Sequence, residues 1–129
     1  MILVDSSVWI ANLRGLETPT VRTLRTLTDP DRLLVGDLIL IEVLQGARSD
    51  AHAERIERNL RQFTLVPLLD GNVPVRAARN YRALRERGVT VRKTIDVIIG
   101  TYCIENGCAL LHDDRDFLPM QEHLGLRSA

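Results

Sequence analysis

Residues 1–10 of the chain are MILVDSSVWI, an apolar run followed by an aspartate and two serines. Ile2–Val4 is a short apolar run that predicts a buried strand, and it ends at Asp5. Ser6 can cap a helix that continues through Leu13. The opening therefore predicts a strand, a tight turn and a helix, which together form half of the unit that builds parallel sheets.

The same alternation of strand and helix continues along the chain. Further strands are predicted at residues 33–35, 64–67 and 109–111. Helices are predicted between them, from the cap Thr18 up to Asp29, from the cap Asp37 to Gly46, over residues 51–62, from Asp70-Gly71 to Gly88, and from the cap Thr94 to Gly107. No hairpin-type turn joins consecutive strands, so the expected fold class is an α/β sandwich with a short, mainly parallel sheet flanked by helices.

Length and composition favour one globular domain over residues 1–129. The chain is 45% hydrophobic and 26% charged, with no long polar tract and no internal repeat. It has no run of about 18 apolar residues and no basic segment before its first apolar run, so we expect neither a membrane span nor secretion. Cys103 and Cys108 are too few for a disulfide framework, and the histidines lack the spacing of a zinc site. We therefore expect a cytoplasmic protein without structural zinc.

The charge of the chain is balanced overall but can be segregated on its surface. Seventeen basic residues offset 17 acidic ones, which by itself disfavours nucleic-acid binding. If five of the acids form one pocket, however, the rest of the surface is basic by five. Lys93 is the only lysine and the other 16 basic residues are arginines, whose guanidinium groups bind phosphate well. A GC-rich genome is the competing explanation of the arginine content.

Acidic residues occur at the places where an open parallel sheet puts its functional site. Asp5 follows the first predicted strand, and three acids follow the last one: Asp113, Asp114 and Asp116. Glu42 and Asp96 lie in the apolar helical stretches LILIEVL and TIDVIIG, where a carboxylate needs a partner. We therefore expect one partly buried acidic pocket.

Such a pocket indicates a hard divalent cation. Clustered carboxylates repel one another unless a cation neutralises them, and oxygen-only ligation favours Mg²⁺ or Mn²⁺. A metal-bound water would then be the nucleophile, which implies hydrolysis of a phosphodiester bond. Each acid also has an ordinary interpretation: Asp96 can complement a helix dipole, Glu42 can reach solvent or an arginine, and the others can be turn residues.

Four stretches of the sequence resemble the PIN-domain nucleases, and more narrowly the VapC-type toxins of bacterial toxin–antitoxin pairs. They are LVDSSVWI, IEVLQG, VRKTIDVIIG and ALLHDDRDF, in the order and at the separations of that family. The resemblance covers essentially the whole chain. It implies that the catalytic acids are Asp5, Glu42, Asp96 and Asp114, and that the metal ligands are these four together with Asp116.

The resemblance also marks where this chain departs from the family. Ser6 matches the Ser or Thr that usually follows the first aspartate. His112 stands where the family often has Thr, which leaves the role of His112 open. Asp113 is interpreted as a variable neighbour outside the site.

The resemblance further implies an endoribonuclease toxin that acts on structured RNA such as tRNA or rRNA. It implies Mg²⁺ with Mn²⁺ as a possible substitute, a homodimer, and a cognate antitoxin that inserts near the acidic pocket. Arg76, Arg79, Arg82 and Arg85 recur every three residues along one predicted helix, although a solvated helix face is the competing interpretation. The residues expected to bind RNA are Arg79, Arg82, Arg92 and Lys93. Trp9, with Ile10 and Leu13, is expected in the core rather than at a partner interface.

Two other functions remain open at this point. One is a phosphatase that uses Asp5 as a covalent nucleophile, but Ser7 stands where that class has a second aspartate. The other is a non-catalytic RNA- or protein-binding module that keeps the fold. All four family positions are acidic here, which favours catalysis over the binding module.

Overall fold

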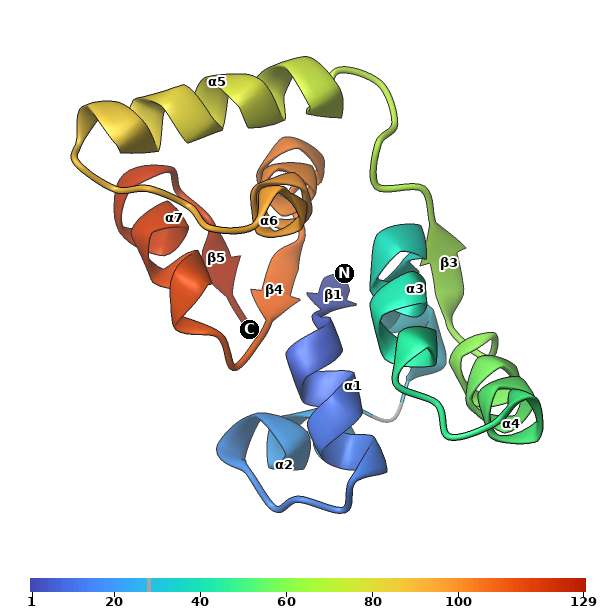
Figure 1. The fold of residues 1–129 in the computed structure, drawn as a ribbon. Coiled ribbons are helices and arrows are strands. Elements are labelled where there is room, and N and C mark those ends of the chain that lie inside the picture. The colour runs from blue at the N-terminus through green and yellow to red at the C-terminus, as the bar shows by residue number, and fades with distance from the viewer. Residues whose placement is uncertain (28) are drawn as a thin grey trace.

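The computed structural model of the chain describes residues 1–27 and 29–129, and its centre is a five-stranded parallel sheet (Figure 1). The strands are β1 (Ile2–Val4), β2 (Leu33–Gly36), β3 (Thr64–Val66), β4 (Ala109–Leu111) and β5 (Arg127–Ser128). They lie in the order β3-β2-β1-β4-β5, and each neighbouring pair is parallel. The predicted fold class is confirmed. β5 was not predicted, because its two exposed residues carry no apolar pattern.

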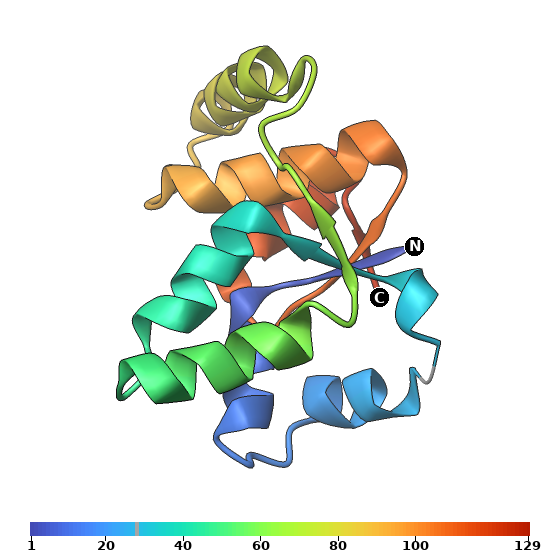
Figure 2. The same cartoon turned by 90° about the vertical axis from the view of Figure 1, so that its right-hand side faces the viewer.

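Helices cover both faces of this sheet. Within the described residues they are α1 (Ser6–Leu13), α2 (Pro19–Thr26), α3 (Asp37–Gln45), α4 (Asp50–Leu60), α5 (Val73–Glu86), α6 (Thr94–Asn106) and α7 (Leu118–His123), with 3-10 turns at Pro30–Arg32 and Arg115–Phe117. Figures 1 and 2 show α5 and α6 on one side of the sheet and α1 and α2 on the other. The predicted helices are present, although α2 ends at Thr26; Thr28, inside the predicted helix, lies outside the described residues.

Three predicted helix caps are wrong by one residue. Ser6, Asp37 and Thr94 are each the first residue of their helix, and the caps are Asp5, Gly36 and Lys93. At α1 the carboxylate of Asp5 accepts the N–H of Ser7, so the aspartate rather than the serine satisfies the helix end. The carboxylate of Asp37 accepts from the N–H groups of Leu38 and Leu68 instead. Thr18 caps α2 as predicted.

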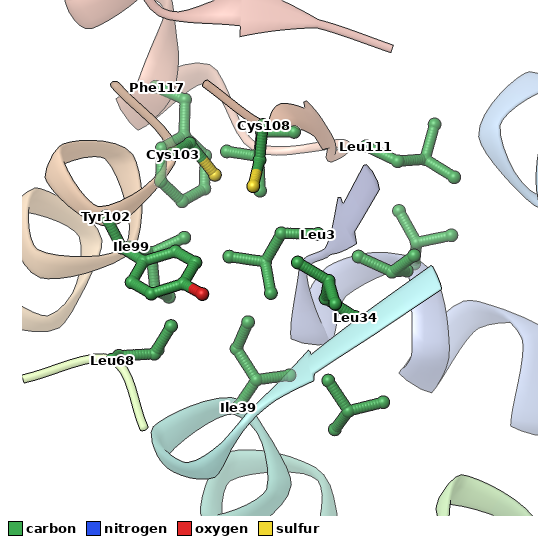
Figure 3. Close-up of a cluster of buried hydrophobic side chains, with 14 of the residues drawn as sticks. Leu3, Leu34, Ile39, Leu68, Ile99, Tyr102, Cys103, Cys108, Leu111 and Phe117 are labelled. Carbon is green, nitrogen blue, oxygen red and sulfur yellow. The ribbon is translucent and has the colours of Figure 1, made fainter. Parts of the chain in front are cut away.

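The hydrophobic core lies between the sheet and its helices. Figure 3 shows apolar side chains of the strands and of α3 and α6 gathered in one cluster, with Leu3 near its centre. Trp9 is 5% exposed and its ring lies 5.3 Å from that of Phe63, which confirms the core interpretation of this residue. Ile10 is half-buried, but Leu13 is exposed at the end of α1, so the core prediction is wrong for Leu13. Among the described residues, none of the helices combines the length and the apolar character that a membrane span requires.

Helix α6 packs closely against α7 at Gly100, where an added side chain would require the end of the Met120 side chain to shift. A Cβ atom added at Gly100 would lie 2.4 Å from Cε of Met120, which is itself fully buried. Gly100 lies one helical turn after Asp96. The close packing therefore fixes the part of α6 that carries this carboxylate.

Candidate active site

The candidate site lies at the point of the sheet where the strand order changes direction, next to β1. β1 has β2 on one side and β4 on the other, so the carboxyl ends of β1 and β4 border a crevice. The chain stays joined to β4 beyond the end of β1, because the N–H of Asp5 donates a 2.9 Å hydrogen bond to the carbonyl of Leu111. Asp5 and the loop after Leu111 are thereby held side by side.

Two helices bring further carboxylates to this crevice. Glu42 in α3 is half-buried, and its Oε1 accepts a 3.2 Å hydrogen bond from the hydroxyl of Ser6. Asp96, in the first turn of α6, is only 4% exposed. The residues that line the resulting pocket of about 310 Å³ are Asp5, Ser6, Ser7, Ile10, Glu42, Gln45, Lys93, Asp96 and Asp114. The structure therefore brings the four predicted catalytic acids together.

Asp116, the additional predicted ligand, belongs to the same group of acids. One carboxylate oxygen from each of Asp96, Asp114 and Asp116 lies within 4.8 Å of the other two. This spacing is short enough for small side-chain rotations to bring all three oxygens to one cation. Asp113, which the prediction excluded, is exposed.

Short hydrogen bonds between side chains and backbone shape both acidic loops. Oδ2 of Asp5 accepts from the N–H of Ser7 at 3.1 Å and from its hydroxyl at 2.6 Å. The hydroxyl oxygen of Ser7 in turn accepts the N–H of Asp113 at 3.1 Å. Oδ1 of Asp114 accepts the N–H of Asp116 at 2.9 Å. Sequence reasoning missed the contribution of Ser7, although a residue two places after an aspartate is where such a turn has its donor.

Burial and mutual repulsion raise the pKa values of three of the acids. Burial, followed by the charges of Asp114 and Asp5, raises the pKa of Asp96 to about 7, while Lys93 acts in the opposite direction. Burial and then the charge of Asp5 raise the pKa of Glu42. Burial also raises the pKa of Asp5 itself, against hydrogen bonds that lower it. Burial and mutual repulsion in the pocket therefore disfavour the ionised form of these three carboxylates.

The carboxylate of Asp96 has the environment of a cation ligand. Its Oδ2 atom is buried and accepts no hydrogen bond from the described residues. A buried acceptor without a donor costs free energy unless another positive group approaches it. The other acids of the pocket offer carboxylate oxygens beside it, and such ligands fit a hard divalent cation.

The four predicted RNA-binding residues lie in different settings. Lys93 lines the acidic pocket. Arg92 is 80% exposed and lies 3.3 Å from Oδ1 of Asp116, a surface ion pair of small stabilising effect. Arg79 is exposed on α5, and Arg82 borders a separate apolar pocket between α5 and α6. The structure thus brings Lys93 and Arg92 to the acids, whereas Arg79 and Arg82 are not among the residues that line the acidic pocket.

Comparison with known proteins supports the same family as the sequence motifs. The family model described as PIN domain matches residues 2–122. Ribonuclease VapC11 of Mycobacterium tuberculosis is 32% identical over 120 residues, which are 91% of this chain and 89% of that protein. The residues matched by the family model include every residue that lines the acidic pocket.

Solved structures share the fold at low sequence identity. VapBC2 from Rickettsia felis, bound to a DNA fragment from its promoter, has a TM-score of 0.79 at 11% identity and covers 100% of this chain and 98% of its own. A toxin–antitoxin complex from Klebsiella pneumoniae has a TM-score of 0.68 at 17% identity and covers 91% of this chain and 90% of its own. With the family match and the VapC relative, these likenesses lead to one assignment: the chain belongs to the PIN domain family and is a relative of the VapC ribonucleases.

Proposed function

We propose that this chain is the endoribonuclease toxin of a toxin–antitoxin pair and that it hydrolyses RNA phosphodiester bonds at the acidic pocket. The observation that carries the proposal is the convergence of four acids from four separated segments in one pocket. One oxygen of Asp96, which is among these four acids, is buried there and accepts no hydrogen bond from the described residues. The ribonuclease name of a relative that is 32% identical over 91% of the chain supports it.

Mg²⁺, with Mn²⁺ as a substitute, is the proposed cofactor. The ligands would be Asp96, Asp114 and Asp116, whose oxygens lie within 4.8 Å of one another, together with Asp5 and Glu42 from the lining of the pocket. When bound, the ion supplies a water nucleophile of lowered pKa and offsets the negative charge of the phosphate. The choice of Mg²⁺ or Mn²⁺ rests on the oxygen-only donor set.

Side chains of the chain itself orient the reacting groups. Hydrogen bonds from Ser6 to Glu42 and from Ser7 to Asp5 restrict the rotation of both carboxylates, which preserves a site ready for a cation. Lys93 lines the pocket, where its ammonium group can pair with a phosphate oxygen of the RNA. Substrate would therefore be held by positive charge directly beside the acids.

The two alternative functions have less support from the geometry. Asp5 is 3% exposed and its Oδ2 accepts two hydrogen bonds from Ser7, which lowers its capacity as a phosphatase nucleophile. A non-catalytic binding module gains nothing from acids that repel one another. Ionising such acids at neutral pH costs folding stability, as the raised pKa of Asp96, about 7, indicates.

The proposed partner of the chain is an antitoxin protein. The support is the similarity in fold to a protein solved as a toxin–antitoxin complex. The homodimer, the tRNA or rRNA substrate and the cytoplasmic location stay predictions.

RNA cleavage by the purified chain tests the proposed function. Cleavage should require Mg²⁺ or Mn²⁺ and should stop in excess EDTA. Asp96→Asn should reduce the rate by roughly a hundredfold or more, because it removes a charged ligand from the reacting centre. Asp113→Asn is the matched control, since Asp113 is an exposed neighbour, and its rate should stay near that of the wild type. Cleavage by Asp96→Asn at the wild-type rate, or cleavage in EDTA, would reject the proposal.

A further inference from the structure

His112 forms a side-chain turn that holds the acidic loop after β4. The N–H of Asp114 donates a 3.2 Å hydrogen bond to Nδ1 of the His112 ring. Nε2 of the same ring is hydrogen-bonded to Oε1 of Gln121 in α7. The ring also packs against Phe117, with the two ring centroids 4.9 Å apart. The imidazole is therefore held by three separate contacts.

These contacts select one tautomer of the ring. A nitrogen that accepts an N–H hydrogen bond must have a free lone pair, so Nδ1 of His112 is unprotonated. The proton of the neutral imidazole then lies on Nε2 and is donated to Oε1 of Gln121. Gln121 thereby stabilises the tautomer that can accept from Asp114.

The geometry is that of an Asx turn made by a histidine. Asn and Asp side chains accept the N–H two residues further on, and Ser and Thr do so more weakly. Asp114 repeats the pattern, because its Oδ1 accepts the N–H of Asp116. A change in the His112 turn would therefore move two of the three carboxylates whose oxygens lie within 4.8 Å of one another.

We propose that His112 is a positioning residue: with Gln121 it holds the backbone at Asp114 so that the Asp114 carboxylate joins those of Asp96 and Asp116 around the cation. This inference rests on the proposed function, because it concerns the alignment of proposed metal ligands. It assigns to His112 the role that the sequence left open.

Binding of MnCl₂ to variants, measured by isothermal titration calorimetry, tests the inference without RNA. His112→Leu removes the acceptor and should weaken Mn²⁺ binding roughly tenfold, as loss of an outer contact to a metal ligand does. His112→Asn keeps an acceptor near the position of Nδ1 and should stay within about threefold of the wild type. Gln121→Leu should lie between them. Thermal unfolding in EDTA measures structural damage separately, and a merely structural role would lower the melting temperature without changing the affinity of the folded protein.

The tautomer is a second, independent measurement. The ¹⁵N chemical shifts of the His112 ring in the wild type should show Nδ1 unprotonated and Nε2 protonated, and Gln121→Leu should shift that balance. A proton on Nδ1 would overturn the inference. So would equal Mn²⁺ affinities of His112→Leu and the wild type, or, if His112→Leu does not fold, equal affinities of Gln121→Leu and the wild type. Absence of Mn²⁺ binding by the wild type would instead overturn the proposed function itself.

Discussion

The hydroxyl group of Ser7 donates a 2.6 Å hydrogen bond to Oδ2 of Asp5. The same oxygen of Ser7 accepts the N–H of Asp113, so one small side chain joins the loops that follow β1 and β4. The donated hydrogen bond stabilises the ionised form of Asp5 and lowers its pKa, in opposition to burial. Ser7 therefore contributes both to the shape and to the charge of the acidic pocket.

Ser7→Ala should destabilise the protein by about 1–3 kcal/mol, because a buried carboxylate oxygen loses a donor. Mn²⁺ affinity should fall as well, since the two loops are no longer tied together. Denaturant unfolding and calorimetric titration measure the two effects. Ser128→Ala, at an exposed serine in β5, is the control and should change neither. Equal stability of the two variants would show that water replaces the hydrogen bonds of Ser7 without loss.

Asp96→Asn should raise the melting temperature of the metal-free protein at about pH 8 and change it little at about pH 5.5. With a pKa of about 7, Asp96 is charged at the higher pH and repelled by Asp114 and Asp5, whereas it is mostly protonated at the lower pH. Asparagine keeps the shape and removes the charge. Differential scanning calorimetry in EDTA measures the effect, with Asp113→Asn as the control. A lower melting temperature at both pH values would favour the interpretation of Asp96 as a helix-dipole partner.

The metal-free wild type should lose stability as the pH rises from about 4 to about 7. The pKa values of Asp5, Glu42 and Asp96 are raised by folding, so the folded chain binds protons more tightly than the unfolded chain. This stabilisation is complete below the ordinary carboxylate pKa and is lost as the pH passes the folded value, about 7 for Asp96. The measurement is the free energy of unfolding as a function of pH. Subtracting the values for Asp96→Asn from those of the wild type removes the contribution of the other titrating groups.

Bound divalent metal should oppose this loss of stability with rising pH, because metal binding requires deprotonated carboxylates. The melting temperature with MnCl₂ should therefore exceed the metal-free value most at the upper end of the pH window. A metal-free difference curve that rises with pH would contradict the raised pKa of Asp96.

Lys93→Ala should weaken RNA binding and reduce the salt dependence of log Kd by roughly one unit, as loss of one phosphate contact does. Arg92→Ala, Arg79→Ala and Arg82→Ala should do the same if each contacts phosphate. Fluorescence anisotropy in an Asp96→Asn background measures binding without cleavage. Arg76→Ala is the control on α5, because Arg76 is ion-paired with Glu105 at 3.3 Å. Unchanged salt slopes would assign the replaced side chains to a solvated surface.

Strands β1 to β4, helices α1 to α6 and the identity of the acids could be predicted from the sequence, whereas α7 and β5 were not. Short apolar runs predicted β1 to β4, because the strands of a parallel sheet covered by helices are rich in apolar residues. Glu42 and Asp96 were found because a carboxylate in an apolar helix is conspicuous without any structure. Where the information is weaker, the prediction fails: β5 has no such pattern, and the cap of α1 is Asp5 rather than Ser6.

The contacts between the acids and their supporting side chains depend on the tertiary structure. The hydrogen bond between Ser7 and Asp113 joins residues 106 positions apart, and it exists because β1 and β4 are neighbours in the sheet. The tautomer of His112 likewise depends on where α7 places Gln121. Composition and periodicity record the environment of each residue in its own segment, whereas these contacts depend on strand order and helix packing, which no single segment contains.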